Sequence, residues 1–177
     1  MTDNIDLSQQ NKILTQEIKR HTNQMAAINM VAAAVGNSLD LDDILQTALE
    51  TTVYTLEADA SGISLIDEKA EELVLRAQLG WQHDFVSNPM RIPMGMGFSG
   101  RVIENDDAMI WSDLDGTEEF AVPSFGDEHF RSIVMAPMHS RTKVIGILSI
   151  MGYEPNIFDQ ASMTMLRVIA DTVGVAL

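Results

Sequence analysis

A chain of 177 residues with no cysteine and a formal net charge of -15 excludes several classes of protein. Without cysteine it has no disulfide framework, cysteine-based metal site, thiol nucleophile or thioether-linked chromophore. The negative charge opposes contact with nucleic acid and anionic lipid, and no apolar run reaches the roughly 18–20 residues of a membrane span. We therefore expect a soluble, cytoplasmic protein with no nucleic-acid or membrane partner.

The first 37 residues carry a heptad pattern. Leu7, Leu14 and Ile28 belong to one line of core positions, and Ile18 and Met25 belong to its neighbour. Steps of three and four residues are typical of a coiled-coil seam. We expect residues 1–37 to form a coiled-coil signalling helix that joins two chains in a homodimer. The alternative is an amphipathic helix that lies on its own domain.

Residues 38–177 predict one further domain. Ser38 or Asp40 can cap a helix that continues to Leu56. The apolar period then changes to two, which predicts strands. The first strands expected are Ser61–Asp67 and Glu72–Leu79, paired as an antiparallel hairpin, followed by the short strand Met90–Ile92.

The segment Pro93–Gly100 is a glycine-rich turn that leads into a short helix. Its three glycines permit positive φ and close backbone approach, which a sharp reversal requires. Phosphate binding is the alternative role of such a turn. Met109–Ser112 predicts another strand, and the acidic segment Asp113–His129 is expected to be a long functional loop.

Two strongly apolar strands, Ser132–His139 and Lys143–Met151, predict the centre of a sheet. Both faces of each strand are apolar, so the sheet must be covered on both sides. Phe158-Asp159 begins a last helix, whose apolar residues again step by three and four. We expect this long C-terminal helix to share in the dimer contact.

Three of these segments together resemble the GAF family of small-molecule sensor domains. They are Pro93–Gly100, Arg131–Met138, and Gly146–Ile150 with Pro155 and Phe158 after it. The resemblance covers residues 39–177 and implies an α/β (α+β) fold. In that fold a central antiparallel sheet is flanked by helices on one face and a ligand pocket on the other. It also implies a bacterial-type signal-transduction protein with a downstream output domain such as a histidine kinase or a cyclase.

The expected pocket lies between the sheet and the loops near Phe98 and residues 113–131. Aromatic side chains with a few polar ones suit a small planar ligand. For each aromatic residue the alternative is core packing. The candidate ligand-binding residues are Phe98, Trp111, Asp113, Phe120, Phe125, His129, Phe130, Arg131 and Met135.

The sequence leaves the ligand open. The signature of cyclic-nucleotide-binding GAF domains is missing, and covalent bilin attachment needs a cysteine. Non-covalent haem or another tetrapyrrole is an alternative, with His139 and His129 as candidate iron ligands. A second alternative is a ligand-free module that dimerises and relays a signal.

We expect the chain not to be an enzyme. Some GAF relatives reduce free methionine sulfoxide with cysteines, which are absent here. No Ser-His-Asp order, HExxH motif or Walker loop is present. The 12 methionines are interpreted as core filling, with no metal site.

Overall fold

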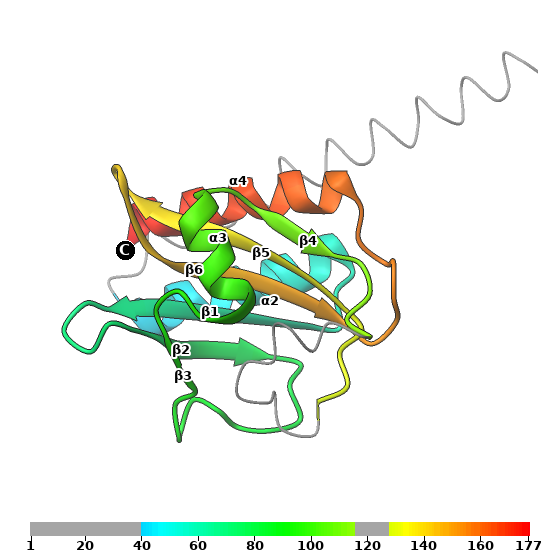
Figure 1. The fold of residues 1–177 in the computed structure, drawn as a ribbon, viewed down its shortest axis with the longest axis horizontal. Coiled ribbons are helices and arrows are strands. Elements are labelled where there is room, and N and C mark those ends of the chain that lie inside the picture. The colour runs from blue at the N-terminus through cyan, green and yellow to red at the C-terminus, as the bar shows by residue number, and fades with distance from the viewer. Residues whose placement is uncertain (1–39, 116–127) are drawn as a thin grey trace, which may run out of the picture.

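The computed structural model describes residues 40–115 and 128–177 (Figure 1). The predicted signalling helix over residues 1–37 and the candidate residues Phe120 and Phe125 lie outside these ranges. The boundary between the two predicted parts of the chain therefore stays a prediction.

The described chain forms one antiparallel sheet and three helices. Their order is α2 (Leu41–Leu56), β1 (Ala60–Asp67), β2 (Glu72–Leu79), β3 (Arg91–Pro93), α3 (Gly97–Asn105), β4 (Met109–Trp111), β5 (Ser132–Ser140), β6 (Lys143–Gly152) and α4 (Gln160–Ala176). The six strands lie in the order β3-β2-β1-β6-β5-β4, and every neighbouring pair is antiparallel. The predicted α+β fold is confirmed, with β3 one residue later than expected.

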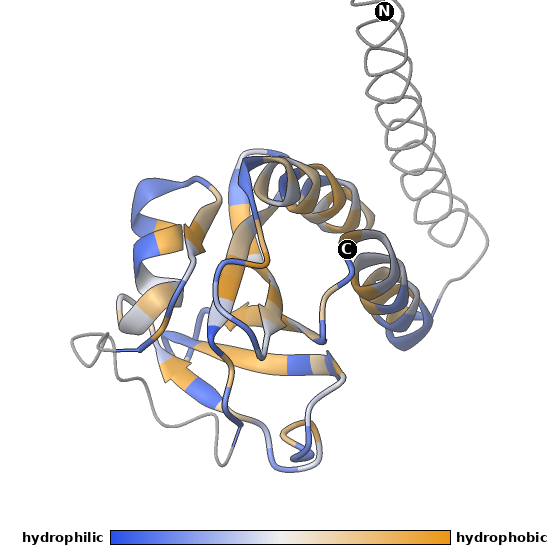
Figure 2. Ribbon diagram, turned by 90° about the vertical axis from the view of Figure 1, so that its right-hand side faces the viewer, coloured by the Kyte–Doolittle hydropathy of each residue, from blue (hydrophilic) through white to orange (hydrophobic). Residues whose placement is uncertain are grey.

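Helices α2 and α4 cover one face of the sheet, as Figures 1 and 2 show. Alternate residues of the central strands point to this face, among them Val134, Leu148 and Ile150, all fully buried. Each helix begins at an aspartate cap. The Asp40 carboxylate accepts a hydrogen bond from the Asp42 backbone N–H, and Asp159 forms a capping box at the start of α4.

The apolar stripe of α4 packs on its own sheet. Leu166, Ala170 and Val173 are fully buried there, and Val175 is the strongly exposed apolar residue near the helix end. The spacing of three and four between apolar residues therefore reflects core packing. The stripe that predicted a dimer contact along this helix is covered by the chain's own sheet. Dimerisation itself stays a prediction.

The short helix α3 covers the opposite face of the sheet (Figure 2). Phe98 and Val102 of α3 pack there against Ile133 and Met151 of the strands. Both faces of the sheet are covered, as the apolar strands predict. No helix in the described ranges is long and apolar enough to cross a membrane.

The glycine turn before α3 has the geometry expected of it. Gly95 and Gly97 adopt left-handed backbone angles, with φ of 81° and 62°, a region that glycine enters without strain. A Cβ atom added to Gly100 would overlap the backbone of Gly95. The turn therefore folds tightly because glycine occupies these positions.

Replacing Gly100 by alanine should lower the free energy of unfolding by about 1–3 kcal/mol, because the new methyl group overpacks the turn. The matched control is Glu104→Ala, on the exposed side of the same helix, which should change stability by less than about 0.5 kcal/mol. Urea unfolding of both variants measures the difference. Equal stability of the two would contradict this account of the turn.

Candidate functional site

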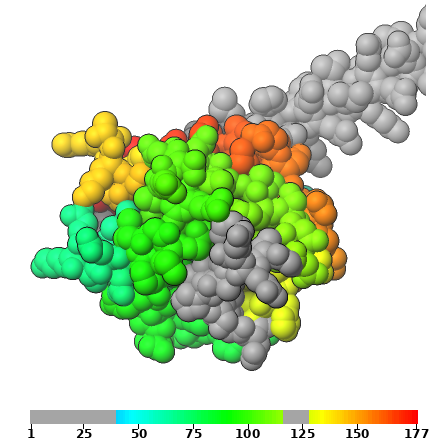
Figure 3. Space-filling model, viewed as in Figure 1, coloured from blue at the N-terminus to red at the C-terminus, as the bar shows by residue number. Residues whose placement is uncertain are grey.

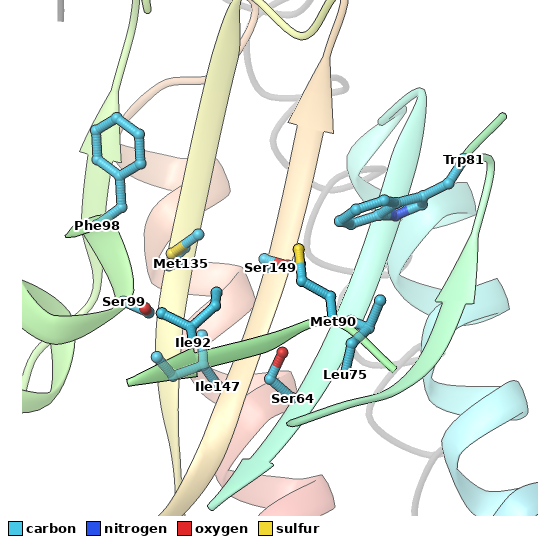
Figure 4. Close-up of a pocket in the computed structure, with 10 residues that line it drawn as sticks. All are labelled: Ser64, Leu75, Trp81, Met90, Ile92, Phe98, Ser99, Met135, Ile147 and Ser149. Carbon is cyan, nitrogen blue, oxygen red and sulfur yellow. The ribbon is translucent and has the colours of Figure 1, made fainter. Parts of the chain in front are cut away.

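A small cavity lies between the sheet and the chain segments that cover its α3 face. Its volume is about 30 Å³. In the space-filling view of this side, the green residues of β3 and α3 cover the middle of the face (Figure 3). The cavity is lined by Ser64, Leu75, Trp81, Met90, Ile92, Phe98, Ser99, Met135, Ile147 and Ser149 (Figure 4).

The floor of the cavity comes from four neighbouring strands. Ser64 of β1 lies opposite Leu75 of β2 and Ile147 of β6, and Met135 of β5 lies opposite Ser149 of β6. Residues directly opposite one another across a strand pair point to the same face. The register of the sheet thus brings these five side chains together.

Two aromatic side chains stand at opposite sides of the cavity, as Figure 4 shows. Trp81 is fixed by a 2.8 Å hydrogen bond from its indole N–H to the carbonyl oxygen of Ser61. It lies so close to Gly62 that a Cβ atom there would be 3.2 Å from the indole. Phe98 packs edge-on against Trp111, with ring centroids 4.7 Å apart. Trp81 and Phe98, the two aromatic walls, are therefore held in place by contacts outside the cavity.

The polar groups of the lining are serine hydroxyls. The Ser149 hydroxyl donates to the Gly62 carbonyl at 3.1 Å, and the Ser99 hydroxyl donates to the Met96 carbonyl at 3.2 Å. No charged side chain is among the ten lining residues. The arrangement can hold a compact apolar group and hydrogen-bond one polar atom.

A buried carboxylate supports the wall that carries Trp81. The Glu128 side chain is fully buried and accepts hydrogen bonds from the backbone N–H groups of Gln82 and His83, with 3.1 Å for the latter. Phe130, two residues later, lies between Trp81 and Tyr153, at centroid distances of 5.7 and 5.1 Å. Glu128 and Phe130, which precede β5, therefore anchor the chain around Trp81.

Arg131 and Asp113 form an ion pair beside the sheet. The guanidinium donates two hydrogen bonds to Asp113 Oδ1, at 3.2 and 3.0 Å, and also lies 2.9 Å from Asp115. The pKa of Asp113 lies below its ordinary value, chiefly because the Asp115 backbone N–H donates to it and also because of Arg131. Two of the three predicted polar ligand contacts, Asp113 and Arg131, thus bind each other.

The nine predicted ligand contacts fall into four groups. Phe98 and Met135 line the cavity, whereas Trp111 and Phe130 pack behind lining residues. Asp113, Arg131 and the exposed His129 are outside the lining, and Phe120 and Phe125 lie outside the described residues. Whether any of them contacts a ligand stays a prediction.

Trp81 and the three serines line the cavity but were not among the predicted site residues. The pair Gly80-Trp81 directly after a strand is the one local signal for Trp81, because a glycine there lets the chain turn back over the sheet. Ser64 and Ser149 on neighbouring strands and Ser99 in α3 carry no comparable signal.

His139, the first candidate for a haem ligand, lies at the end of β5 and is not in the cavity lining. Its Nε2 atom is 2.8 Å from Asp106 Oδ1 and its Nδ1 atom is 3.1 Å from Asp171 Oδ1. Both ring nitrogens are therefore engaged, and iron ligation would require one of these contacts to break. Within residues 40–115 and 128–177 no cluster of three metal-ligating side chains is present.

The same histidine joins two helices. Asp106 follows the last turn of α3, and Asp171 is in α4. A second ion pair, between Asp107 and Arg167, spans the same gap. The hydrogen bond with Asp106 is the main reason that the pKa of His139 is raised, with partial burial acting against it and Asp171 adding to it.

The model of the GAF domain family matches residues 38–177. No curated protein matches the sequence. The chain is similar to the solved GAF domain of an Acinetobacter phosphoenolpyruvate-protein phosphotransferase, with a TM-score of 0.77, 21% identity, and 86% of this chain and 91% of that one covered.

Two further solved structures are free methionine-R-sulfoxide reductases. The Neisseria meningitidis enzyme, solved with its substrate, has a TM-score of 0.74 and 20% identity, with 86% of this chain and 87% of that one covered. The reduced Staphylococcus aureus enzyme has a TM-score of 0.72 and 19% identity, with 88% and 95% covered. At such identities the similarity shows a shared fold alone.

The expectation that the chain is not an enzyme is wrong as a conclusion from sequence, because structures with this fold include enzymes. It equated the absence of familiar catalytic motifs with the absence of catalysis. The GAF fold itself carries both regulatory domains and reductases, so fold and missing motifs do not decide the matter.

Replacing His139 by glutamine should lower stability in a pH-dependent way. The pKa of His139 is raised in the folded state, so the contacts of its charged ring with Asp106 and Asp171 stabilise the fold fully below the unfolded-state pKa of about 6.5. This stabilisation is lost as the pH rises through the folded-state pKa. The difference in unfolding free energy between wild type and His139→Gln should therefore be larger near about pH 6 than near about pH 9. Urea unfolding across this range measures it, and Asp171→Asn, which removes one arm, should show a smaller effect. A difference independent of pH would contradict this role of the charged ring.

Proposed function

Because the chain belongs to the GAF domain family, we propose that residues 38–177 are a ligand-binding regulatory domain whose ligand occupies the cavity under α3. One observation carries this proposal: side chains from β1, β2, β5, β6, α3 and the Trp81 segment converge on one internal space. Cavities with mostly apolar walls and a few placed polar groups are typical of small-molecule sites.

The contacts of α3 support a route from the cavity to α4. A ligand in the cavity touches Phe98 and Ser99 at the start of α3. The chain at the other end of the helix is tied to α4 through His139 and through the pair of Asp107 and Arg167. A ligand that binds one position of α3 more tightly than another shifts the population of α4 arrangements.

The domain then acts as the input part of a cytoplasmic signal-transduction protein. The heptads of residues 1–37 hold two copies together as a homodimer, and movement of α4 reaches a downstream output domain. The basis for the dimer is the sequence spacing, since the buried stripe of α4 supplies none.

A substitution that fills the cavity tests the site. Ser64→Leu adds a large side chain at the floor and should abolish the stabilisation that any ligand from a thermal-shift screen gives the wild type. At one hundred times its Kd such a ligand adds about 2.7 kcal/mol. The matched control Thr142→Leu, in the exposed turn between β5 and β6, should keep the full effect. If the ligand stabilises both variants equally, the ligand does not bind in this cavity.

Light scattering on the full chain tests the dimer. The account expects a species of twice the 19.5 kDa chain mass. A charge in the seam, Ile18→Asp, should dissociate it, whereas Gln16→Asp, off both lines of core positions, should not. A monomer at high concentration in the wild type would refute the coiled-coil interpretation.

A further inference from the structure

We infer that the cavity selects a compact, uncharged molecule with an apolar ring or branched body and a single hydroxyl or N–H group. This ligand class rests on the proposed function, because it concerns the same cavity. It follows from the charge, the shape and the hydrogen-bonding capacity of the ten lining side chains.

Among the residues that the structure describes, the lining offers an ion no partner of opposite charge. Seven of the ten lining residues are apolar or aromatic and three are serines. Glu128 and Arg131, on the nearby segment leading to β5, are engaged with the His83 backbone and with Asp113. A carboxylate, ammonium ion or phosphate in the cavity would lose its water without gaining an opposite charge, which makes its burial strongly unfavourable.

The walls restrict the size of the ligand. The cavity has about 30 Å³, whereas an apolar cavity of about 150 Å³ is known to hold benzene. Met90 and Met135 are the lining side chains best able to make room, because an unbranched thioether has three rotatable bonds and packs well against aromatic rings. Figure 4 places both between Phe98 and Trp81. A single ring or similar body can therefore enter only if these methionines shift, and a larger body would need the walls to move as well.

The serines determine which polar group the ligand carries. The hydroxyls of Ser99 and Ser149 already donate to backbone carbonyls, so their oxygens are left as acceptors. The Ser64 hydroxyl has no hydrogen-bond partner among the residues that the structure describes, and it points toward the space between Ile147 and Met90 (Figure 4). A ligand O–H or N–H group can therefore donate to a serine oxygen, and a ligand hydroxyl can also accept from Ser64.

Methionine-methyl NMR of the full chain tests this class with four probes that share one ring: benzyl alcohol, toluene, benzoate and benzylammonium. Met90 and Met135 report on the cavity, and Met138 and Met165 in the helix-covered core are internal controls. Met90→Leu and Met135→Leu assign the two reporter signals. Benzyl alcohol should shift both reporters most strongly and toluene more weakly. The two ions should leave them unchanged at the same concentration.

A serine substitution tests the polar contact. Ser64→Ala should weaken the binding of benzyl alcohol about fivefold, the usual effect of one neutral hydrogen bond, and should leave toluene unchanged. The control is Ser140→Ala, at the far end of β5 and outside the lining, which should alter neither. Unchanged binding of benzyl alcohol to Ser64→Ala would overturn the role of this hydroxyl.

The remaining outcomes separate the ligand class from the proposed function. If benzoate or benzylammonium shifts Met90 and Met135 as strongly as benzyl alcohol, the neutral class is wrong and the cavity remains a binding site. If no probe shifts these two signals, or if the shifts occur at Met138 and Met165 instead, both the class and the proposed site are wrong.

Discussion

The two-sided burial of β5 and β6 is the constraint on which the rest of this structure depends. Both faces of these strands are apolar, with Val134 and Leu148 on one side and Ile133 and Met135 on the other. Exposure of either face to water would be costly, so each needs a cover. Two long helices pack closely over one face. A short helix and irregular chain cover the other, and irregular cover is where an internal cavity can remain.

The two faces of the sheet are therefore held together in different ways. The α2 and α4 side is filled by long apolar side chains and carries most of the core. The α3 side is held by a glycine turn, an anchored tryptophan and a buried glutamate, which fix its edges and leave its middle adjustable. His139 joins the two sides, because it contacts the chain after α3 and α4 at once. A change beneath α3 therefore has a direct physical connection to α4.

The elements of the fold were predictable because they depend on local periodicity, and the glycine turn because it depends on backbone sterics. The cavity lining was only partly predictable. A register shift between Ile63 and Ser64 places Leu75 opposite Ser64 and passes over Arg76, and no local pattern reveals such a shift. Asp113 and Arg131 were expected to bind a ligand but pair with each other across 18 positions, a contact that exists only in the folded chain. The apolar period of α4 fitted both a core helix and a dimer contact, and packing decided for the core.

The proposed function requires that the cavity under α3 binds a ligand and that α4 responds. Amide hydrogen exchange, with and without a ligand that raises the melting temperature, tests it most directly. The account predicts slower exchange in α3 and in the strands under the cavity, together with changed exchange in the turn of α4 around Asp171. Protection confined to the outer surfaces of α2 and α4, with α3 unaffected, would contradict it.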